Sequence, residues 1–241
     1  MRRIILTTLF AVFVLFLYGP TITIVVLSFQ GPNGGLTFPM NGVSLHWFVR
    51  LFEQQAVGDF GGSLSRSLML ACMVMATTVV ISVAAGLAFR RRFRGDTALF
   101  TLTIASLIIP SILVSLGVGL VFSLTGLDTD WYNSAFGAQL TWTLPFGLFT
   151  MFAVVNRFNR SYEEAANDLG ANAWQRLVYV TLPILLPGII GIAMGAFTLS
   201  YDEYARTTLA IGSHNTLPLA IYALISSATS PTLFAIGTLT T

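Results

Sequence analysis

Long apolar runs separated by short polar segments dominate this chain. Five of these runs contain no charged residue, and each exceeds the roughly 20 residues that a helix needs to cross a bilayer. They are Ile4–Phe29, Ser67–Phe89, Thr97–Leu127, Trp131–Asn156 and Leu177–Tyr201. The pattern predicts an all-α membrane protein with five complete spans.

A sixth apolar segment begins near Pro231 and continues to Thr241. Eleven residues rise about 16 Å as a helix, which is roughly half of a bilayer, so we expect an incomplete sixth span. The preceding segment, Thr207–Ser230, is apolar but interrupted by glycine, asparagine and proline. It predicts one or two short helices, or a re-entrant piece at the outer face.

Prolines occur in four of the five spans, at Pro20, Pro110, Pro145 and the pair Pro183 and Pro187. Proline removes a backbone donor and kinks a helix, and membrane helices tolerate this where neighbours satisfy the freed carbonyls. Kinked helices suit a pathway that opens and closes. Proline is also simply commoner in membrane helices, so both interpretations stay open.

The arginines predict the orientation of the spans. If the spans alternate, nine of the twelve basic residues fall on one side: Arg2, Arg3, Arg90, Arg91, Arg92, Arg94, Arg157, Arg160 and Arg176. Positive charge marks cytoplasmic loops, so the N-terminus is predicted to be cytoplasmic. A cleaved signal peptide is disfavoured, because the first apolar run continues to Phe29 with no small-x-small site.

Composition supports this interpretation and excludes several classes. Hydrophobic residues make up 55% and charged residues 9%, with a net charge of +2, which indicates lipid as solvent and gives no reason to expect nucleic acid. Cys72 is the single cysteine, so no internal disulfide can form. The chain has no lysine and therefore no P-loop lysine, so any ATP must be bound by another subunit.

The polar loop of about residues 157–180 carries the most specific local pattern. Ser161 and Glu164 have capping-box spacing, Gly170 suits a left-handed helix end, and Asn172 with Gln175 repeats the capping spacing. Two short helices joined at Gly170 are predicted. A rigid elbow of this kind could dock into a cytoplasmic partner, or it could be only a well-capped loop.

This loop resembles the EAA signature of binding-protein-dependent ABC importer permeases. The matching residues are Glu164-Ala165-Ala166, then Gly170 after three residues, then Val180-Thr181-Leu182-Pro183 after nine more, with Val180 standing for isoleucine. The whole chain is similar to the second permease subunit of spermidine/putrescine-type importers. Further similar stretches are His46-Trp47-Phe48, Arg91-Arg92-Phe93-Arg94-Gly95, Ser200-Tyr201-Asp202-Glu203, Leu217-Pro218-Leu219 and Ile221-Tyr222.

The resemblance implies a type I ABC importer transmembrane domain of about six spans, with residues 1–241 forming one permease domain in a bacterial inner membrane. Its expected partners are a second, different permease subunit, a periplasmic binding protein, membrane lipid and two ATPase subunits that hold ATP and Mg²⁺. The chain itself would be no enzyme, would bind no cofactor and would work by alternating access. Glu164, Ala165, Ala166 and Gly170 would couple the ATPase to the spans.

Four residues are candidates for contact with a cationic, polyamine-like solute. Asp202 and Glu203 are adjacent acids after the fifth span, Tyr201 lies beside them, and Trp47 matches an aromatic family position. Carboxylates attract cations, and aromatic faces add cation–π binding. Alternatively, the two acids face water and pair with Arg206 at helical spacing.

One departure weakens the polyamine assignment. Ser111 follows Pro110, where close polyamine relatives carry an acidic residue. An opine, a betaine-like compound or an amino-acid derivative therefore stays an alternative solute. No carboxylate–histidine cluster predicts a metal site, since His46 and His214 are isolated.

Two other classes fit the sequence less well. A hydrolase would need a nucleophile with a base in register, and no Gly-x-Ser-x-Gly elbow occurs. A secondary transporter or channel would need ionisable residues within its spans, which here are uncharged.

Overall fold

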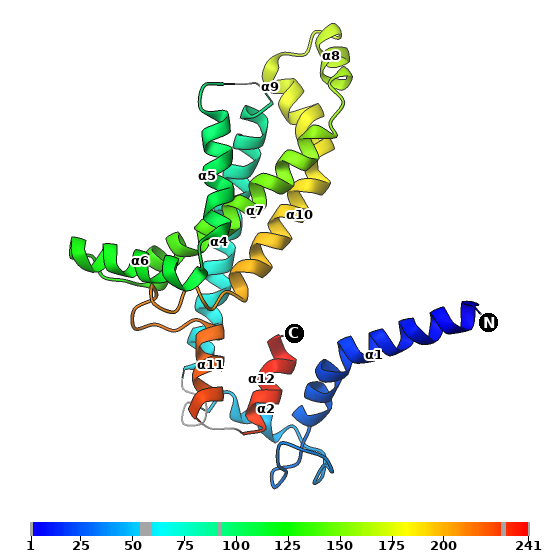
Figure 1. Cartoon of the computed structure of the whole chain (residues 1–241), viewed down its shortest axis with the longest axis vertical. Helices are drawn as coiled ribbons and strands as arrows, with labels where there is room; N and C mark the ends of the chain where they lie inside the picture. The colour runs from blue at the N-terminus through cyan, green and yellow to red at the C-terminus, as the bar shows by residue number, and fades with distance from the viewer. Residues whose placement is uncertain (1, 54–58, 91–92, 228–229, 241) are drawn as a thin grey trace. The chain divides into compact units, whose positions relative to one another are not determined.

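The computed structural model describes residues 2–53, 59–90, 93–227 and 230–240. Regular structure in these ranges is helical, apart from one isolated bridge between Gln30 and Val43. Figure 1 shows the helices in chain order. The chain divides into two compact units, residues 1–64 with 219–241 and residues 65–218. That residues 1–241 act as one permease domain stays a prediction.

The first unit contains α1 (Arg2–Ser28), α2 (His46–Arg50) and α12 (Thr232–Thr240), with α12 packing against the other two. The apolar stretch of α1 is almost entirely exposed, so its side chains are available to lipid or another helix. Between α1 and α2, the buried Gln30 side chain closes a loop, because its Nε2 donates to Gly35 O at 3.0 Å. With nine residues, α12 is about 14 Å long, shorter than a bilayer is thick.

The second unit is built on three long helices. They are α4 (Phe60–Ala88), which begins in the first unit, α7 (Phe136–Asn156) and α10 (Leu182–Tyr201). Two π-helical turns, η1 (Trp131–Ala135) and η2 (Leu177–Thr181), lead into α7 and α10 and lengthen both. The buried core between the helices includes Met151, Leu185 and Ile192. After α10 the chain reaches α11 (Leu217–Ser227), which crosses the boundary between the units.

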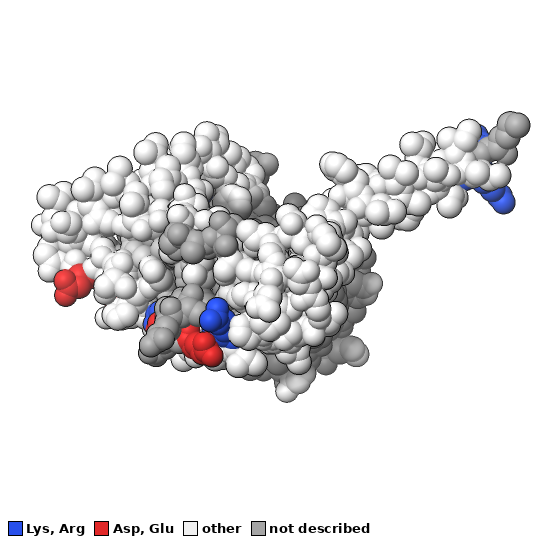
Figure 2. All heavy atoms as spheres, turned by 90° about the horizontal axis from the view of Figure 1, so that it is seen from below, with Lys and Arg blue, Asp and Glu red and all other residues white. Residues whose placement is uncertain are grey.

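The membrane prediction is confirmed for four spans. The helices that are long and apolar enough to cross a bilayer in the described ranges are Arg2–Ser28, Phe60–Ala88, Trp131–Asn156 and Ala173–Tyr201. Figure 2 shows one face of the molecule, on which uncharged residues predominate and charged atoms appear in a few separate places. This scarcity of surface charge fits a protein that is solvated by lipid.

The predicted third span is not a single helix. Residues 96–125 form α5 (Asp96–Ile108) and α6 (Ser111–Thr125), which meet at an angle of 105°. The break lies at Ile109, whose backbone is extended (φ −67°, ψ 127°) and which precedes Pro110. Proline disfavours helical backbone in the residue before it, which allows a break here, whereas Pro20, Pro145 and Pro187 lie inside their helices. The pair is a broken span or a re-entrant loop.

The three long helices approach one another closely at Gly147 in α7. A Cβ atom at this position would lie 2.7 Å from Thr78 Cγ2 of α4 and 3.3 Å from Ile192 Cγ2 of α10. Such a Cβ would also collide with the Ser82 hydroxyl. Small residues allow membrane helices to pack at short range, so the packing requires glycine here.

We predict that Gly147→Val destabilises the protein by about 1–3 kcal/mol through overpacking. The thermal denaturation midpoint in detergent should fall by roughly 2–10 °C. Gly137→Ala, in the same helix, is the matched control, because a Cβ there meets no atom within 4 Å. An equal loss for both variants would contradict the packing argument.

Candidate functional site

The loop between α7 and α10, residues 157–180, folds as an elbow of two short helices, α8 (Ser161–Asp168) and α9 (Ala173–Arg176). The turn between them has Gly170 at φ +84°, which confirms the predicted left-handed glycine. The capping box before α9 is also confirmed, since Asn172 and Gln175 exchange side-chain-to-backbone hydrogen bonds at 2.9 Å.

The capping box predicted at the start of α8 is wrong. Arg160 occupies the N-cap position without a side-chain cap, and Ser161 is the first helical residue. Asn159 takes over part of the role, because its Oδ1 accepts the Ser161 backbone N–H at 3.1 Å. The helix therefore begins with its two glutamates, Glu163 and Glu164, in the first turn, where the helix dipole favours negative charge.

A charged clasp fixes α8 to the rest of the second unit. The Arg90 guanidinium, just beyond the end of α4, donates two parallel hydrogen bonds of 2.7 Å to the two carboxylate oxygens of Glu163. The Thr181 hydroxyl, at the end of η2, donates to the same carboxylate at 2.7 Å. Arg90–Glu163–Thr181, which we call the clasp, thus joins the ends of two spans to the elbow.

Neighbouring side chains hold the clasp in place. The Arg90 guanidinium lies 5.0 Å from the centre of the Phe158 ring, and Arg160 donates to the Arg90 carbonyl at 3.1 Å. Within the elbow, the Arg176 guanidinium donates to Asn167 Oδ1 at 2.9 Å, which joins α9 to α8. The elbow is therefore held to the end of α4 and to η2 by directed charged hydrogen bonds.

The clasp borders a polar hollow of about 550 Å³ beneath the elbow. Its lining includes three arginines and three acids: Arg90, Arg160, Arg176, Glu163, Glu164 and Asp168. Only 16% of the Arg90 side chain and 26% of the Glu163 side chain are exposed, so the clasp is shielded from water on most sides. Partial burial strengthens the attraction between the two charges.

The hydrogen bonds from Arg90, followed by that from Thr181, lower the pKa of Glu163 from its ordinary value of 4.5 to about 2, although burial opposes the shift. A carboxyl whose pKa is lower in the folded protein stabilises the fold above its unfolded pKa. That contribution disappears as the pH falls from about 4.5 towards 2. The clasp is therefore fully formed at neutral pH.

We predict that Glu163→Gln lowers the thermal denaturation midpoint at pH 7, and that the difference from the unmodified protein shrinks as the pH falls from about 5 towards 3. The physical reason is that protonation removes the same charge as the substitution. Glu164→Gln, on the same helix, is the control and should change the midpoint at pH 7 less than Glu163→Gln does. A difference for Glu163→Gln that stays constant across this pH range would contradict the clasp.

The residues that sequence reasoning selected in the elbow lie beside the clasp. Glu164 and Ala165 are exposed and Ala166 is half-buried on α8, while Gly170 is exposed at the turn. In the described part of the chain, no hydrogen bond or ion pair joins the Glu164 carboxylate. This carboxylate is thus available to a partner, and its coupling role stays a prediction.

Sequence reasoning missed the clasp. Glu163 and Glu164 are adjacent, and local rules do not indicate which of them faces the spans. Arg90 belongs to an arginine cluster that only suggested orientation, and Arg91 and Arg92 lie outside the described residues. Only the fold shows that Glu163 contacts η2, through the hydrogen bond from Thr181.

At the other end of the second unit, the segment 202–216 carries the candidate solute contacts. Asp202 is exposed at the end of α10, and Tyr201 stacks on Phe197 with ring centres 5.9 Å apart. Glu203 accepts the backbone N–H of Arg206 at 2.9 Å. The acids thus lie where the sequence suggested, and their contact with solute stays a prediction.

Arg206 itself is buried, with 1% of the residue exposed, and its contact with the acids is the backbone hydrogen bond to Glu203. Its guanidinium donates to the Thr141 hydroxyl at 2.6 Å and lies 5.3 Å from the centre of the Trp142 ring. Arg206 therefore anchors the segment 202–216 to α7.

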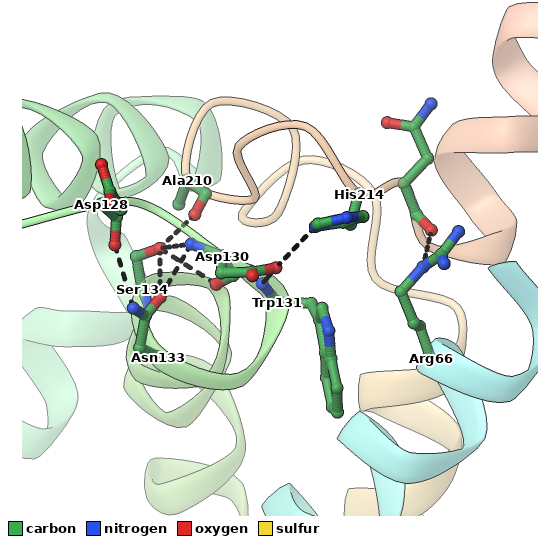
Figure 3. A network of polar contacts seen from close by, with 9 residues as sticks. Arg66, Asp128, Asp130, Trp131, Asn133, Ser134, Ala210 and His214 are labelled. Carbon is green, nitrogen blue, oxygen red and sulfur yellow. Dashed lines mark hydrogen bonds and ion pairs between the residues drawn. The ribbon is translucent and has the colours of Figure 1, made fainter. Parts of the chain in front are cut away.

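Further contacts fix this segment to the start of α7, as Figure 3 shows. His214 Nδ1 lies 3.4 Å from Asp130 Oδ1, and the Ser134 hydroxyl donates to the Ala210 carbonyl. Asp130 and Asn133 form a capping box at the start of η1. The segment 202–216 thus packs against η1 and α7 through side-chain contacts.

The fourth candidate contact, Trp47, belongs to the first unit. It is 6% exposed, and its buried indole N–H has no acceptor among the described residues. Arg50 lies 5.8 Å from the ring centre. No group of three or more potential metal ligands occurs within the described ranges.

Comparison with known proteins identifies the family. The family model described as "Binding-protein-dependent transport system inner membrane component" matches residues 78–241, which include the elbow. The chain belongs to this family. It is a membrane-spanning transport subunit.

Relatives of this inner membrane component include polyamine permeases. It is 28% identical to the spermidine/putrescine transport system permease protein PotC of Haemophilus influenzae, over 93% of this chain and 86% of that protein. It is also 28% identical to the putrescine transport system permease protein PotI of Escherichia coli, over 93% and 81% of the two chains.

Solved structures confirm the fold of this inner membrane component. A chain of a bacterial ABC transporter involved in the import of alginate superimposes with a TM-score of 0.72 at 17% identity, covering 98% of this chain and 89% of that one. The same kind of transporter in complex with a periplasmic protein gives 0.65 at 18% identity, covering 99% and 86%. The predicted fold class, the transmembrane domain of an ABC importer, is confirmed.

Proposed function

We propose that this chain is one of two permease subunits in an ATP-driven importer that moves a small cationic organic solute, of the polyamine class, into the cytoplasm. The observation that carries the proposal is the elbow, a family-matching loop that is folded into two short helices and held to two spans by the clasp. Such an element can transmit a partner's motion to the spans. A secondary transporter has no use for one.

The partners follow from this role. Two ATPase subunits would hold ATP and Mg²⁺, and one of them would receive the elbow, with Glu164, Ala165 and Ala166 on the docking surface. A second, different permease would complete the pathway, and a periplasmic binding protein would deliver the solute. The relative captured with its periplasmic protein supports the last assignment. The arginine distribution supports a cytoplasmic N-terminus.

Solute transport would then proceed by alternating access. ATP binding draws the elbows of the two permeases together, and the clasp carries this displacement to the end of α4 and the start of α10. The outer side opens to the loaded binding protein, and ATP hydrolysis resets the spans. This chain contributes no catalytic group.

The test is affinity purification of the tagged chain from solubilised membranes, followed by mass spectrometry and ATPase assays in vesicles. Recovery of a P-loop ATPase and a second permease, with uptake stimulated by a binding protein, is the expected result. Recovery of the intact chain alone would refute the importer assignment. Uptake of a zwitterionic solute in place of polyamines would refute only the solute class.

For solute recognition, we predict that Asp202→Asn lowers uptake of a cationic solute about threefold to tenfold, because one exposed charge contributes about 1 kcal/mol to attraction. Asp128→Asn is the matched control, since Asp128 is also exposed and precedes α7. An equal loss for a neutral solute, or for the control variant, would remove Asp202 from recognition.

A further inference from the structure

A second hollow, of about 680 Å³, lies where α4, α5 and α7 meet at the elbow end of the spans. Its walls are aromatic. Phe89 and Phe152 have ring centres 4.9 Å apart, and Phe100 of α5 lies 5.5 Å from Phe149 and 5.9 Å from Phe152. Helices α5 and α7 and the turn after α4 therefore contribute phenylalanines to one apolar surface.

This apolar surface is open. Phe100 is 39% exposed, and Phe89, Phe149 and Phe152 are only half-buried. The helices do not close over the rings as they do over the core residue Met151, which is 0% exposed. In a membrane-spanning protein, lipid acyl chains are among the apolar groups that can fill such a space.

The rim of the same hollow is polar and carries both signs of charge. Arg90 lines it, but its guanidinium is already neutralised by Glu163. That leaves Arg160, which is exposed and uses one N–H to bond the Arg90 carbonyl. It also leaves Asp96, which accepts the Thr97 backbone N–H at 2.6 Å and the Thr97 hydroxyl at 3.1 Å through Oδ1.

Each of these two side chains keeps capacity for a ligand. The remaining guanidinium N–H groups of Arg160 and the second oxygen of Asp96 have no hydrogen-bond or ion-pair partner within the described ranges. Guanidinium groups bind phosphate well, and carboxylates bind ammonium groups. The rim therefore offers one site for an anion and one for a cation beside an open aromatic surface.

We propose that this hollow binds a zwitterionic phospholipid with a primary ammonium headgroup. The phosphate bonds Arg160, the ammonium group bonds Asp96, and an acyl chain lies against the phenylalanines. Among the described residues that line the hollow, Arg160 and Asp96 carry the two charges that Glu163 does not neutralise, and these two charges cancel, which matches a zwitterion. An anionic lipid would leave Asp96 uncompensated near its phosphate, at a cost in Coulomb energy. The proposal requires a membrane-spanning chain but no particular solute.

The test places the photo-crosslinking residue benzoylphenylalanine at position 100 in the complete importer, within native-like vesicles of phosphatidylethanolamine and phosphatidylglycerol in equal amounts. Mass spectrometry then identifies the adduct. Leu102 is the matched control position, because it lies on the same helix, is 65% exposed and does not line the hollow. We expect a phosphatidylethanolamine adduct in at least threefold excess at position 100 and no preference at position 102.

Headgroup recognition is tested by Arg160→Gln and Asp96→Asn. Each should abolish the preference at position 100, whereas Arg157→Gln, which removes a nearby exposed charge outside the hollow, should preserve it. A peptide adduct from an ATPase or permease subunit would overturn the proposal, as would equal adducts of the two lipids at position 100. Loss of the importer's ATPase activity alone would not affect this readout, so the two proposals fail separately.

Discussion

Replacing Arg90 with alanine is expected to lower binding-protein-stimulated ATPase activity and uptake about tenfold or more. The substitution leaves the Glu163 carboxylate, only 26% exposed, without its two charged donors. Removing one member of a part-buried charged pair costs on the order of 1–3 kcal/mol, and 1.4 kcal/mol changes an equilibrium tenfold. Without these hydrogen bonds, a displacement of the elbow would no longer be transmitted to α4.

A double-mutant cycle separates the clasp from a general loss of stability. Glu163→Ala alone should resemble Arg90→Ala, and the double variant should lose less than the sum of the two, because no unpaired charge remains. Arg90→Lys should be intermediate, since lysine keeps the charge but cannot form the paired hydrogen bonds. Arg94→Ala, in the same arginine cluster, is the control. Strictly additive losses would show that the two residues act independently.

Replacing Gly170 with alanine is expected to reduce coupled ATPase activity severalfold while membrane insertion stays intact. The backbone at Gly170 has φ +84°, a conformation that costs a residue with a Cβ roughly 1–2 kcal/mol. A Cβ there meets no atom within 4 Å, so the cost is purely one of backbone conformation. The expected consequence is a change in the angle between α8 and α9.

Two further variants test whether the effect comes from the backbone conformation at Gly170. Gly170→Asn should retain more activity than Gly170→Ala, because asparagine tolerates left-handed backbone better. Gly95→Ala carries the same kind of strain, at φ +96° and again with open space around the Cβ, but lies outside the elbow. We expect it to leave coupling largely unchanged. Unchanged stimulated ATPase activity in Gly170→Ala would refute the role of the elbow angle.

Both predictions concern how the elbow is held. The turn at Gly170 sets the relative direction of α8 and α9, and the clasp fixes α8 to the ends of two spans. A changed turn at Gly170 would weaken docking of the elbow to the ATPase subunit. Loss of the clasp would leave docking intact but prevent the elbow from moving the spans. The two variants should therefore differ in assembly: Gly170→Ala weakens recovery of the ATPase subunit, and Arg90→Ala does not.

Sequence by itself determined the features that depend on local rules. Apolar runs longer than about 20 residues placed the spans, because a bilayer requires that length whatever the packing. Gly170 and the Asn172–Gln175 box were predicted correctly, because turn and capping preferences depend on a few neighbouring residues. The family signature in the elbow identified the kind of transporter, because its residue types and their spacing lie within one continuous stretch of the chain.

Tertiary structure decided the features that depend on distant residues. The angle of 105° at Pro110 could not be predicted, because a proline kinks a helix or breaks it according to what its halves pack against. Glu163, and not Glu164, forms the clasp because Arg90, 73 positions earlier in the chain, lies beside it in the fold. Likewise, only the packing of α4, α5 and α7 brings Asp96 and Arg160 to one hollow. Sequence specifies such partners only through the fold, since charge pairs form wherever packing brings the side chains within a few ångströms.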